Sequence, residues 1–255
     1  MLPKLSNNSI IFVQGASKGI GLAFIKKFLK DDSVRKVIAS SRNPEESPLA
    51  ELKIKNPQKL EVHNLDLECQ GSIEVCAEQI MDANDGIDLI LNASGFLHDD
   101  LVKPEKRISD LNLEGLTKSF SINTFGPILL TAKLLHLLKN KPHSLIVNIS
   151  AKVGSIEDNL SGGWHSYRSS KAAQNMLTKN LAIELSKNKK FNTICVALHP
   201  GTVDTDLSRP FSKNVEPKKL FTTEECVDNL LSVINGLEEE DSGCFFDWSG
   251  KKISW

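Results

Sequence analysis

The chain has 255 residues, of which 40% are hydrophobic and 25% are charged, as is ordinary for one large domain with a substantial core. Its formal net charge is -1, so no global field attracts nucleic acid or an acidic membrane, and we expect neither partner. We treat residues 1–255 as a single domain.

Short apolar runs rich in Val, Ile and Phe alternate with longer runs whose apolar residues recur at three- and four-residue spacing. The short runs predict strands buried on both faces, and the long runs predict amphipathic helices. Strands are expected at Ser9–Gln14, Lys36–Ser40, Leu60–Asn64, Asp88–Asn92, Ser144–Ser150, Thr193–Leu198 and Gly243–Trp248. Helices are expected at Ile20–Lys30, Gly71–Ala83, Phe125–Lys139, Lys171–Lys187 and Thr222–Leu237. This alternation predicts a doubly wound α/β domain with a seven-stranded parallel sheet and helices on both faces.

The first predicted strand runs directly into the stretch QGASKGIGLAF, in which Gly15, Gly19 and Gly21 are spaced GxxxGxG. Glycine lets the backbone turn sharply and approach a pyrophosphate, which the N-terminus of the following helix stabilises. At the first strand–helix junction of a parallel sheet, this pattern favours a Rossmann-type nucleotide site over a purely structural turn.

The end of the second predicted strand indicates which nucleotide binds. Ser41 and Arg42 lie at this point, and no acidic residue occurs before Glu45. An acidic residue here binds the ribose 2′-OH of NAD, whereas an arginine accommodates the 2′-phosphate of NADP. Lys18 in the glycine loop adds a second cation. Either residue alone is often a solvated surface charge, but together they favour NADP(H).

Tyr167 is the only tyrosine, and Lys171 follows it four residues later. A phenol with a reference pKa of about 10 is a poor acid at neutral pH. A lysine four residues on lies on the same helix face, where its ammonium can lower the phenol pKa. This pair predicts acid–base chemistry, and the alternative is a tyrosine that only packs at a helix start.

Five cysteines form no CxxC pair and no His-coupled metal spacing, so no metal site is expected. Free cysteines fit a reducing compartment. The N-terminal stretch MLPKLSNNSIIFVQG has no apolar core of an export signal, and no uninterrupted run approaches 18 apolar residues. We therefore expect a cytoplasmic protein.

The order GxxxGxG, Asn-x-x-Gly and Tyr-x-x-x-Lys resembles the short-chain dehydrogenase/reductase family over essentially the whole chain. QGASKGIG is similar to the family's TGxxxGxG, with Gln14 in place of the threonine. LNASG is similar to its NNAG, with Ala93 and Ser94 as departures. The stretch ISAKVGSIEDNLSGGWHSYRSSKAA and the ending DWSGKKISW are similar to the C-factor and sniffer-like carbonyl reductase branch.

The resemblance implies hydride transfer from NADPH to a ketone or aldehyde, with Tyr167 as general acid and Lys171 also binding the ribose. It implies that Asp66 contacts the adenine ring, that Asn123 serves a proton-relay water, and that Thr205 after the Pro-Gly motif holds the nicotinamide amide. The expected catalytic residues are Tyr167, Lys171, Asn123 and Ser150. The expected cofactor-binding residues are Gly15, Ser17, Lys18, Gly19, Ile20, Gly21, Ser41, Arg42, Asp66, Leu67, Asn92, Ala93, Ser94, Gly95, Tyr167, Lys171, Pro200, Gly201, Val203 and Thr205. A homodimer or homotetramer is expected by the same resemblance.

The family's catalytic serine, which orients the substrate carbonyl, falls on Ala151, three residues before Gly154. Ser150 lies one position earlier and should point to the opposite face unless the strand end bulges. We expect such a bulge to turn Ser150 inward, because a carbonyl still needs a donor. Ala151 and the C-factor resemblance leave open an alternative, a nucleotide-binding signalling or scaffold protein with little turnover. Substrate specificity is assigned to residues 154–164 and 208–221, which carry no readable code.

Overall fold

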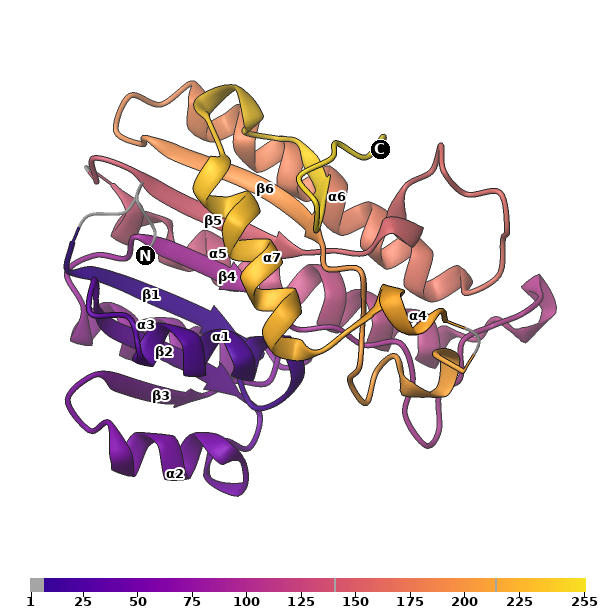
Figure 1. Cartoon of the computed structure of the whole chain (residues 1–255), viewed down its shortest axis with the longest axis horizontal. Coiled ribbons are helices and arrows are strands. Elements are labelled where there is room, and N and C mark those ends of the chain that lie inside the picture. The colour runs from indigo at the N-terminus through magenta and orange to yellow at the C-terminus, as the bar shows by residue number, and fades with distance from the viewer. Residues whose placement is uncertain (1–6, 140, 214) are drawn as a thin grey trace.

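A computed structural model describes residues 7–139, 141–213 and 215–255 (Figure 1). Its main sheet has seven strands in the order β3-β2-β1-β4-β5-β6-β9, and every paired strand within it is parallel. The doubly wound sheet predicted from the sequence is confirmed. The strands are β1 (Ser9–Gln14), β2 (Val34–Ser41), β3 (Leu60–Asn64), β4 (Leu89–Asn92), β5 (Ser144–Ile149), β6 (Thr193–His199) and β9 (Phe245–Asp247).

Helices cover both faces of this sheet, and α7 crosses in front of it in Figure 1. One face packs against α1, α2 and α7, and the other packs against α3, α5 and α6. The α-helices are α1 (Gly19–Leu29), α2 (Pro48–Lys55), α3 (Gln70–Ala83), α4 (Leu113–Phe120), α5 (Gly126–Leu134), α6 (His165–Ser186) and α7 (Thr223–Gly236).

Strand β1 illustrates why the strand runs are continuously apolar. Ile11 and Val13 point into the core on the α1 side, whereas Ile10 and Phe12 point into the core on the α3 side. Successive side chains alternate between faces, and here both faces are buried. The sequence therefore shows no polar alternation.

Three helical features differ from the expectation. Helices α2 and α4 were not expected, and α6 begins at His165 rather than at Lys171. Both short helices carry a side-chain cap, since Ser47 accepts from Leu49 N and Asn112 accepts from Gly115 N. Both helices are only eight residues long, which is short for a periodic pattern, and the caps were the better indicator.

A two-stranded sheet formed by β7 (Thr202–Val203) and β8 (Leu220–Phe221) was also not expected. It pairs the two ends of the stretch that the sequence suggested was a surface loop, so residues 204–219 form a loop whose two ends are held side by side. The sheet holds this loop at the carboxyl end of β6, where ligands bind in open parallel sheets.

The helical run Leu113–Leu138 is long and apolar enough by composition to cross a membrane, with a mean hydropathy of 1.2. However, 56% of that apolar window is buried inside the protein, where Leu130 and Leu134 pack in the core. This is the behaviour of a core helix. Residues 1–6, which contribute to the expectation about export, lie outside the described residues.

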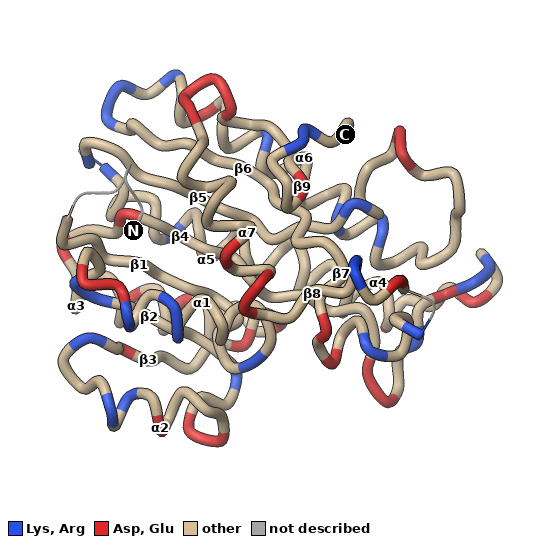
Figure 2. Tube along the Cα trace, in the orientation of Figure 1, with Lys and Arg blue, Asp and Glu red and all other residues tan. Residues whose placement is uncertain are grey.

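Charged residues of both signs are interspersed along the visible trace in Figure 2. This pattern agrees with the formal net charge of -1. Within the described residues, no group of three or more His, Cys, Asp or Glu side chains is placed to hold a metal ion.

Candidate active site

Where β1 leads into α1, the chain packs so closely that Gly15 and Gly21 have no room for a side chain. At Gly15, where φ is +80°, a Cβ would lie 2.7 Å from Ser94 N, and at Gly21 it would lie 2.2 Å from the Gly15 carbonyl oxygen. No side chain caps α1, and its first turn holds no acidic residue. Free N–H groups beside a bare backbone fit a pyrophosphate. The other predicted residues of this loop surround it: Ser17 half-buried, Lys18 exposed, Gly19 at φ +54° and Ile20 against the core.

The carboxyl end of β2 carries two buried hydroxyl groups. Ser40 is 0% exposed and Ser41 is 7% exposed, and neither Oγ meets a hydrogen-bond partner among the described residues. Buried hydroxyls are normally hydrogen-bonded, so an unpartnered pair at a strand end fits a site where a ligand supplies the partner. Ser41 is thus suited to the position predicted for it beside the cofactor.

The two cations expected to recognise a 2′-phosphate already have partners. Arg42 lies 4.0 Å from a Glu68 oxygen, and Lys18 lies 3.5 Å from an Asp206 oxygen. Neither carboxylate partner was expected from the sequence. Both pairs are largely exposed and therefore weak, so a phosphate would compete with a carboxylate at modest cost.

Asp66 and Leu67 form the turn after β3. Asp66 Oδ1 accepts from Glu68 N at 3.0 Å, and Asp66 N donates to Ser72 Oγ at 2.9 Å. Leu67 is buried against Gly126 at the start of α5. The turn is thus held by its own hydrogen bonds and by this packing.

The residues after β4 face the glycine loop from the other side. Asn92 is buried and donates to Asn148 Oδ1 at 2.7 Å, so its amide nitrogen is committed to the protein interior. Ala93 and Ser94 are half-buried, and Gly95 is exposed. The backbone of Ser94 borders Gly15, since a Cβ on Gly15 would lie 2.7 Å from Ser94 N.

Tyr167 and Lys171 lie one turn apart near the start of α6, and both are buried. Lys171 Nζ donates to the Ile149 carbonyl oxygen at 2.9 Å and to Gln174 Oε1 at 3.0 Å. Burial lowers the pKa of Lys171 to about 7 and raises the pKa of Tyr167 above its usual value. The lysine was expected to lower the phenol pKa; in this structure burial dominates, and the shift has the opposite sign.

Asn123 lies in a π-helical turn, Ser121–Phe125, between α4 and α5. Its amide nitrogen donates to the Phe96 carbonyl oxygen and to Ser170 Oγ, each at 2.9 Å, and its amide oxygen accepts from Phe96 N at 2.7 Å. Asn123 thereby ties the segment after β4 to α6, three residues from Tyr167. Single π turns often occur at functional sites.

Ser150 does not make the inward turn that was expected. The register of β5 with β6 is unbroken to Ile149, and Ser150 N continues the ladder by donating to the Leu198 carbonyl oxygen. The Ser150 hydroxyl is buried and donates to Asn175 Oδ1 at 2.6 Å. Without a bulge, the strand alternation holds, and Ala151 occupies the family's serine position.

The segment after β6 reaches the glycine loop. Pro200 and Val203 are buried, and Gly201 has φ +79°. The Thr205 methyl group lies 3.4 Å from the place of a Cβ on Gly19. The Pro-Gly motif therefore directs Thr205 toward the same loop that the glycines form.

An aromatic cover lies over Tyr167, and we define it as Trp164, Phe211 and His98. The Trp164 ring is 6.3 Å from the Tyr167 ring and 4.9 Å from the Phe211 ring. Phe211 is 5.5 Å from the His98 ring, and His98 Nε2 lies 3.1 Å from the Leu207 carbonyl oxygen. The specificity loops assigned from sequence thus meet above the tyrosine.

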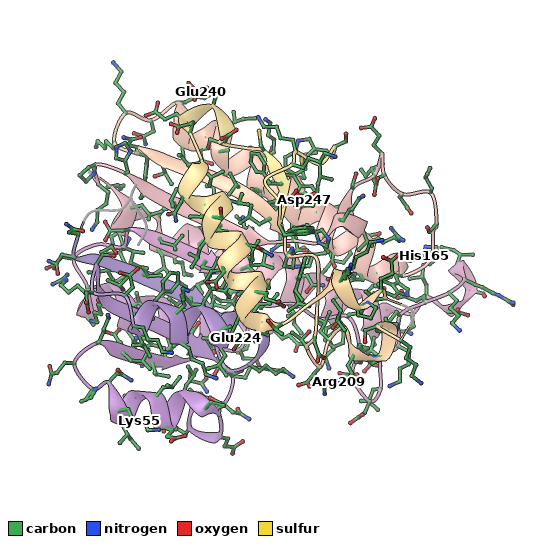
Figure 3. All side chains as sticks on the ribbon, in the orientation of Figure 1. Lys55, His165, Arg209, Glu224, Glu240 and Asp247 are labelled. Carbon is green, nitrogen blue, oxygen red and sulfur yellow. The ribbon has the colours of Figure 1, made fainter. Side chains whose placement is uncertain are left out.

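Figure 3 shows His165, the first residue of α6, and Arg209, from the segment after β6, toward the same end of the molecule. Glu105, from the segment after β4, also lies here, and its Oε2 accepts from Ser166 N at 3.2 Å. Sequence reasoning missed Glu105 and His98. A single acid in the stretch VKPEKR has no spacing that marks it, and the contact joins positions 61 residues apart.

Comparisons with known proteins show which family and fold this chain is similar to. A family model described as short chain dehydrogenase matches residues 9–216. The NADPH-bound carbonyl reductase from chicken fatty liver is 31% identical, over 98% of this chain and 95% of that one, with a TM-score of 0.85. The carbonyl reductase Sniffer of D. melanogaster is 26% identical, over 97% and 99%, with a TM-score of 0.82. The C-signal of Myxococcus xanthus is 32% identical, over 58% of this chain and 83% of that protein.

Proposed function

Because the chain belongs to the short-chain dehydrogenase family and is an oxidoreductase of that family, we propose that it uses NADPH to reduce a ketone or an aldehyde to an alcohol. One observation carries the proposal. The buried pair Tyr167 and Lys171 lies at the carboxyl end of β5, on a sheet whose first loop is shaped for a pyrophosphate.

The cofactor site is proposed from three features of this chain. The uncapped start of α1, next to the tightly packed glycine loop, offers N–H groups to the pyrophosphate, and the unpartnered Ser41 hydroxyl lies where a ribose phosphate is expected. Arg42 and Lys18 add positive charge. When bound, the reduced nicotinamide supplies the hydride that reaches the carbonyl carbon.

Tyr167 supplies the proton that the carbonyl oxygen then needs. A phenol whose pKa is raised by burial stays protonated at neutral pH and is able to donate. Lys171, with a pKa of about 7, exchanges protons easily near neutral pH and stabilises the tyrosinate that donation leaves. Burial beneath the aromatic cover keeps bulk water from competing for this proton.

The direct test follows NADPH absorbance with a panel of aldehydes, quinones and ketones. Oxidation of NADPH that depends on a carbonyl substrate and is lost in Tyr167→Phe supports the proposal. NADPH binding without turnover on any member of the panel contradicts it.

A second candidate is a nucleotide-binding signalling or scaffold protein, favoured by Ala151 in the serine position and by the similarity to C-signal. It predicts cofactor binding without useful turnover. The same assay therefore separates the two functions.

We also propose a cytoplasmic location and a homodimer or homotetramer. The assembly is supported by apolar side chains exposed on or beside α5 and α6. Phe125 is 50% exposed, Leu129 46%, Met176 61% and Ile183 43%.

A further inference from the structure

Glu105 is a buried acid outside the groups that the proposed reaction uses. It is 5% exposed and lies in the segment between β4 and α4. Its carboxylate accepts from Ser166 N at 3.2 Å and from the Ser166 hydroxyl, and its own carbonyl oxygen accepts from Trp164 N at 2.6 Å. Glu105 therefore accepts hydrogen bonds from Trp164, just before the first residue of α6, and from Ser166, in its first turn.

Helix α6 does not cap its own N-terminus. Trp164, at the capping position, makes no side-chain hydrogen bond to the helix, and the first turn contains no acidic residue. A helix start presents free N–H groups and the positive end of the helix dipole. Glu105 supplies both the missing acceptor and a negative charge.

No Lys, Arg or His in the described part of the chain lies within ion-pair distance of the Glu105 carboxylate. A buried carboxylate is unfavourable unless hydrogen bonds and a field of opposite sign stabilise it. The start of α6 provides that stabilisation. The Glu105 carboxylate and the N-terminus of α6 therefore stabilise each other.

The turn before α6 is conformationally unfavourable. Gly162, Gly163 and Trp164 are consecutive left-handed residues, with φ of +62°, +66° and +49°. A residue with a side chain adopts this conformation only where its surroundings enforce it. The hydrogen bond from Trp164 N to the Glu105 carbonyl oxygen and the ring contacts with Tyr167 and Phe211 do so here.

We propose that Glu105 is a positioning residue of the active site, which fixes the first turn of α6 and the turn before it so that Tyr167 and Trp164 keep their places. The inference rests on the proposed function for its catalytic consequence. Glu105 acts through Ser166, which directly precedes Tyr167, and through the backbone of Trp164.

The test compares Glu105→Ala and Glu105→Gln, with Glu225→Ala as the matched control. Glu225 also caps a helix start, since its Oε2 accepts from Thr222 N at 2.8 Å, but it lies on α7 and has no role in the site. Glu105→Ala should lower kcat by about 10- to 100-fold, because a misplacement of about 1 Å can cost about 100-fold. NADPH affinity should change less than about twofold, since other elements form its site. Glu105→Gln, which keeps an acceptor oxygen, should recover most of the rate.

Hydrogen exchange at the amides of residues 164–168 tests the same point without a substrate. Exchange should rise in Glu105→Ala and stay near wild type in Glu225→Ala. The wild type could turn over no carbonyl while exchange at residues 164–168 still rises in Glu105→Ala. In that case the proposed function is wrong, but the inference that Glu105 fixes the turn before α6 is supported.

Two results overturn the inference. One is a Glu105→Ala protein with unchanged kcat or unchanged exchange at residues 164–168. The other is a loss of kcat and NADPH affinity in equal proportion, as a general loss of folded protein would give. If Glu105→Ala does not fold, Glu105→Asp is measured in its place. It withdraws the acceptor oxygens by one methylene, so kcat should fall and exchange at residues 164–168 should rise; wild-type values of both would overturn the inference.

Discussion

The ammonium nitrogen of Lys171 lies 2.9 Å from the carbonyl oxygen of Ile149, so the lysine of α6 is tied to the last residue of β5. The side chain of Lys171 is therefore fixed by both α6 and β5. Tyr167 lies one helical turn before it and is also buried.

Tyr167→Phe should lower turnover by at least about 100-fold, because it removes the proton donor of an acid-catalysed step. NADPH affinity should remain within about twofold of the wild type, since the ring is kept. Lys171→Ala should reduce both. Steady-state rates and fluorescence titration with NADPH measure the two effects, and a Tyr167→Phe enzyme that retained most of its rate would rule out the assigned role.

Lys171→Met should stabilise the cofactor-free protein near pH 6. The folded-state pKa of Lys171 is about 7, below the unfolded reference of about 10.4, so unfolding takes up a proton between these values. Lysine burial therefore penalises the fold fully below about pH 7, and the penalty is relieved as the pH rises toward about 10. At about 1.4 kcal/mol per pKa unit, this difference between the folded and unfolded pKa corresponds to a penalty of up to roughly 5 kcal/mol. Thermal unfolding from pH 6 to 10 should show the difference shrinking with pH; a constant difference would contradict the shift.

The wild type should bind NADPH more tightly than NADH, and Arg42→Ala should narrow the gap. The phosphate displaces an exposed carboxylate, Glu68, from Arg42, so the preference should also weaken as salt is added. Dissociation constants for NADPH and NADH at two ionic strengths measure this preference and its dependence on salt. Equal wild-type affinities would remove the basis for the NADPH assignment.

Ala151→Ser should raise the rate by up to about 100-fold, since a preorganised donor of this kind is typically worth about 10²- to 10³-fold. Ser150→Ala should instead cost about 1–3 kcal/mol of unfolding free energy by leaving the buried Asn175 oxygen without its donor. Its rate per folded molecule should stay near wild type. A large loss of kcat in Ser150→Ala at full stability would mean that Ser150 reaches the substrate after all.

The protein should be a dimer or tetramer at micromolar concentration, and Met176→Glu should weaken the assembly. This side chain is 61% exposed on α6, and a charge there would have to be desolvated in an apolar interface. Light scattering gives the mass of each form. A monomeric wild type would dispose of the proposal.

The sheet, the glycine loop and the paired Tyr167 and Lys171 could be predicted from the sequence because each depends on local spacing. A strand buried on both faces, or two residues one helical turn apart, leaves a pattern within a few positions. The direction of the Ser150 side chain was harder, since it depends on whether one strand end bulges. The unbroken pairing with β6 decides it.

Features formed by distant segments could not be predicted in this way. Glu105 reaches the start of α6 across 61 residues, and Lys18 meets Asp206 across 188. Nothing near Lys18 in the sequence indicates that a carboxylate from the segment after β6 lies 3.5 Å from it. The spacing of residues within one loop carries no information about such a distant partner.

The segment after β6 contacts two different parts of the site. Near its start, Thr205 lies against Gly19 and Asp206 pairs with Lys18; farther along, Phe211 packs on Trp164 above Tyr167. The pairing of β7 with β8 holds both ends of this segment at the carboxyl end of β6. One segment therefore borders both the glycine loop and the aromatic cover, so a substitution within it should alter the proposed cofactor site and the proposed substrate site together.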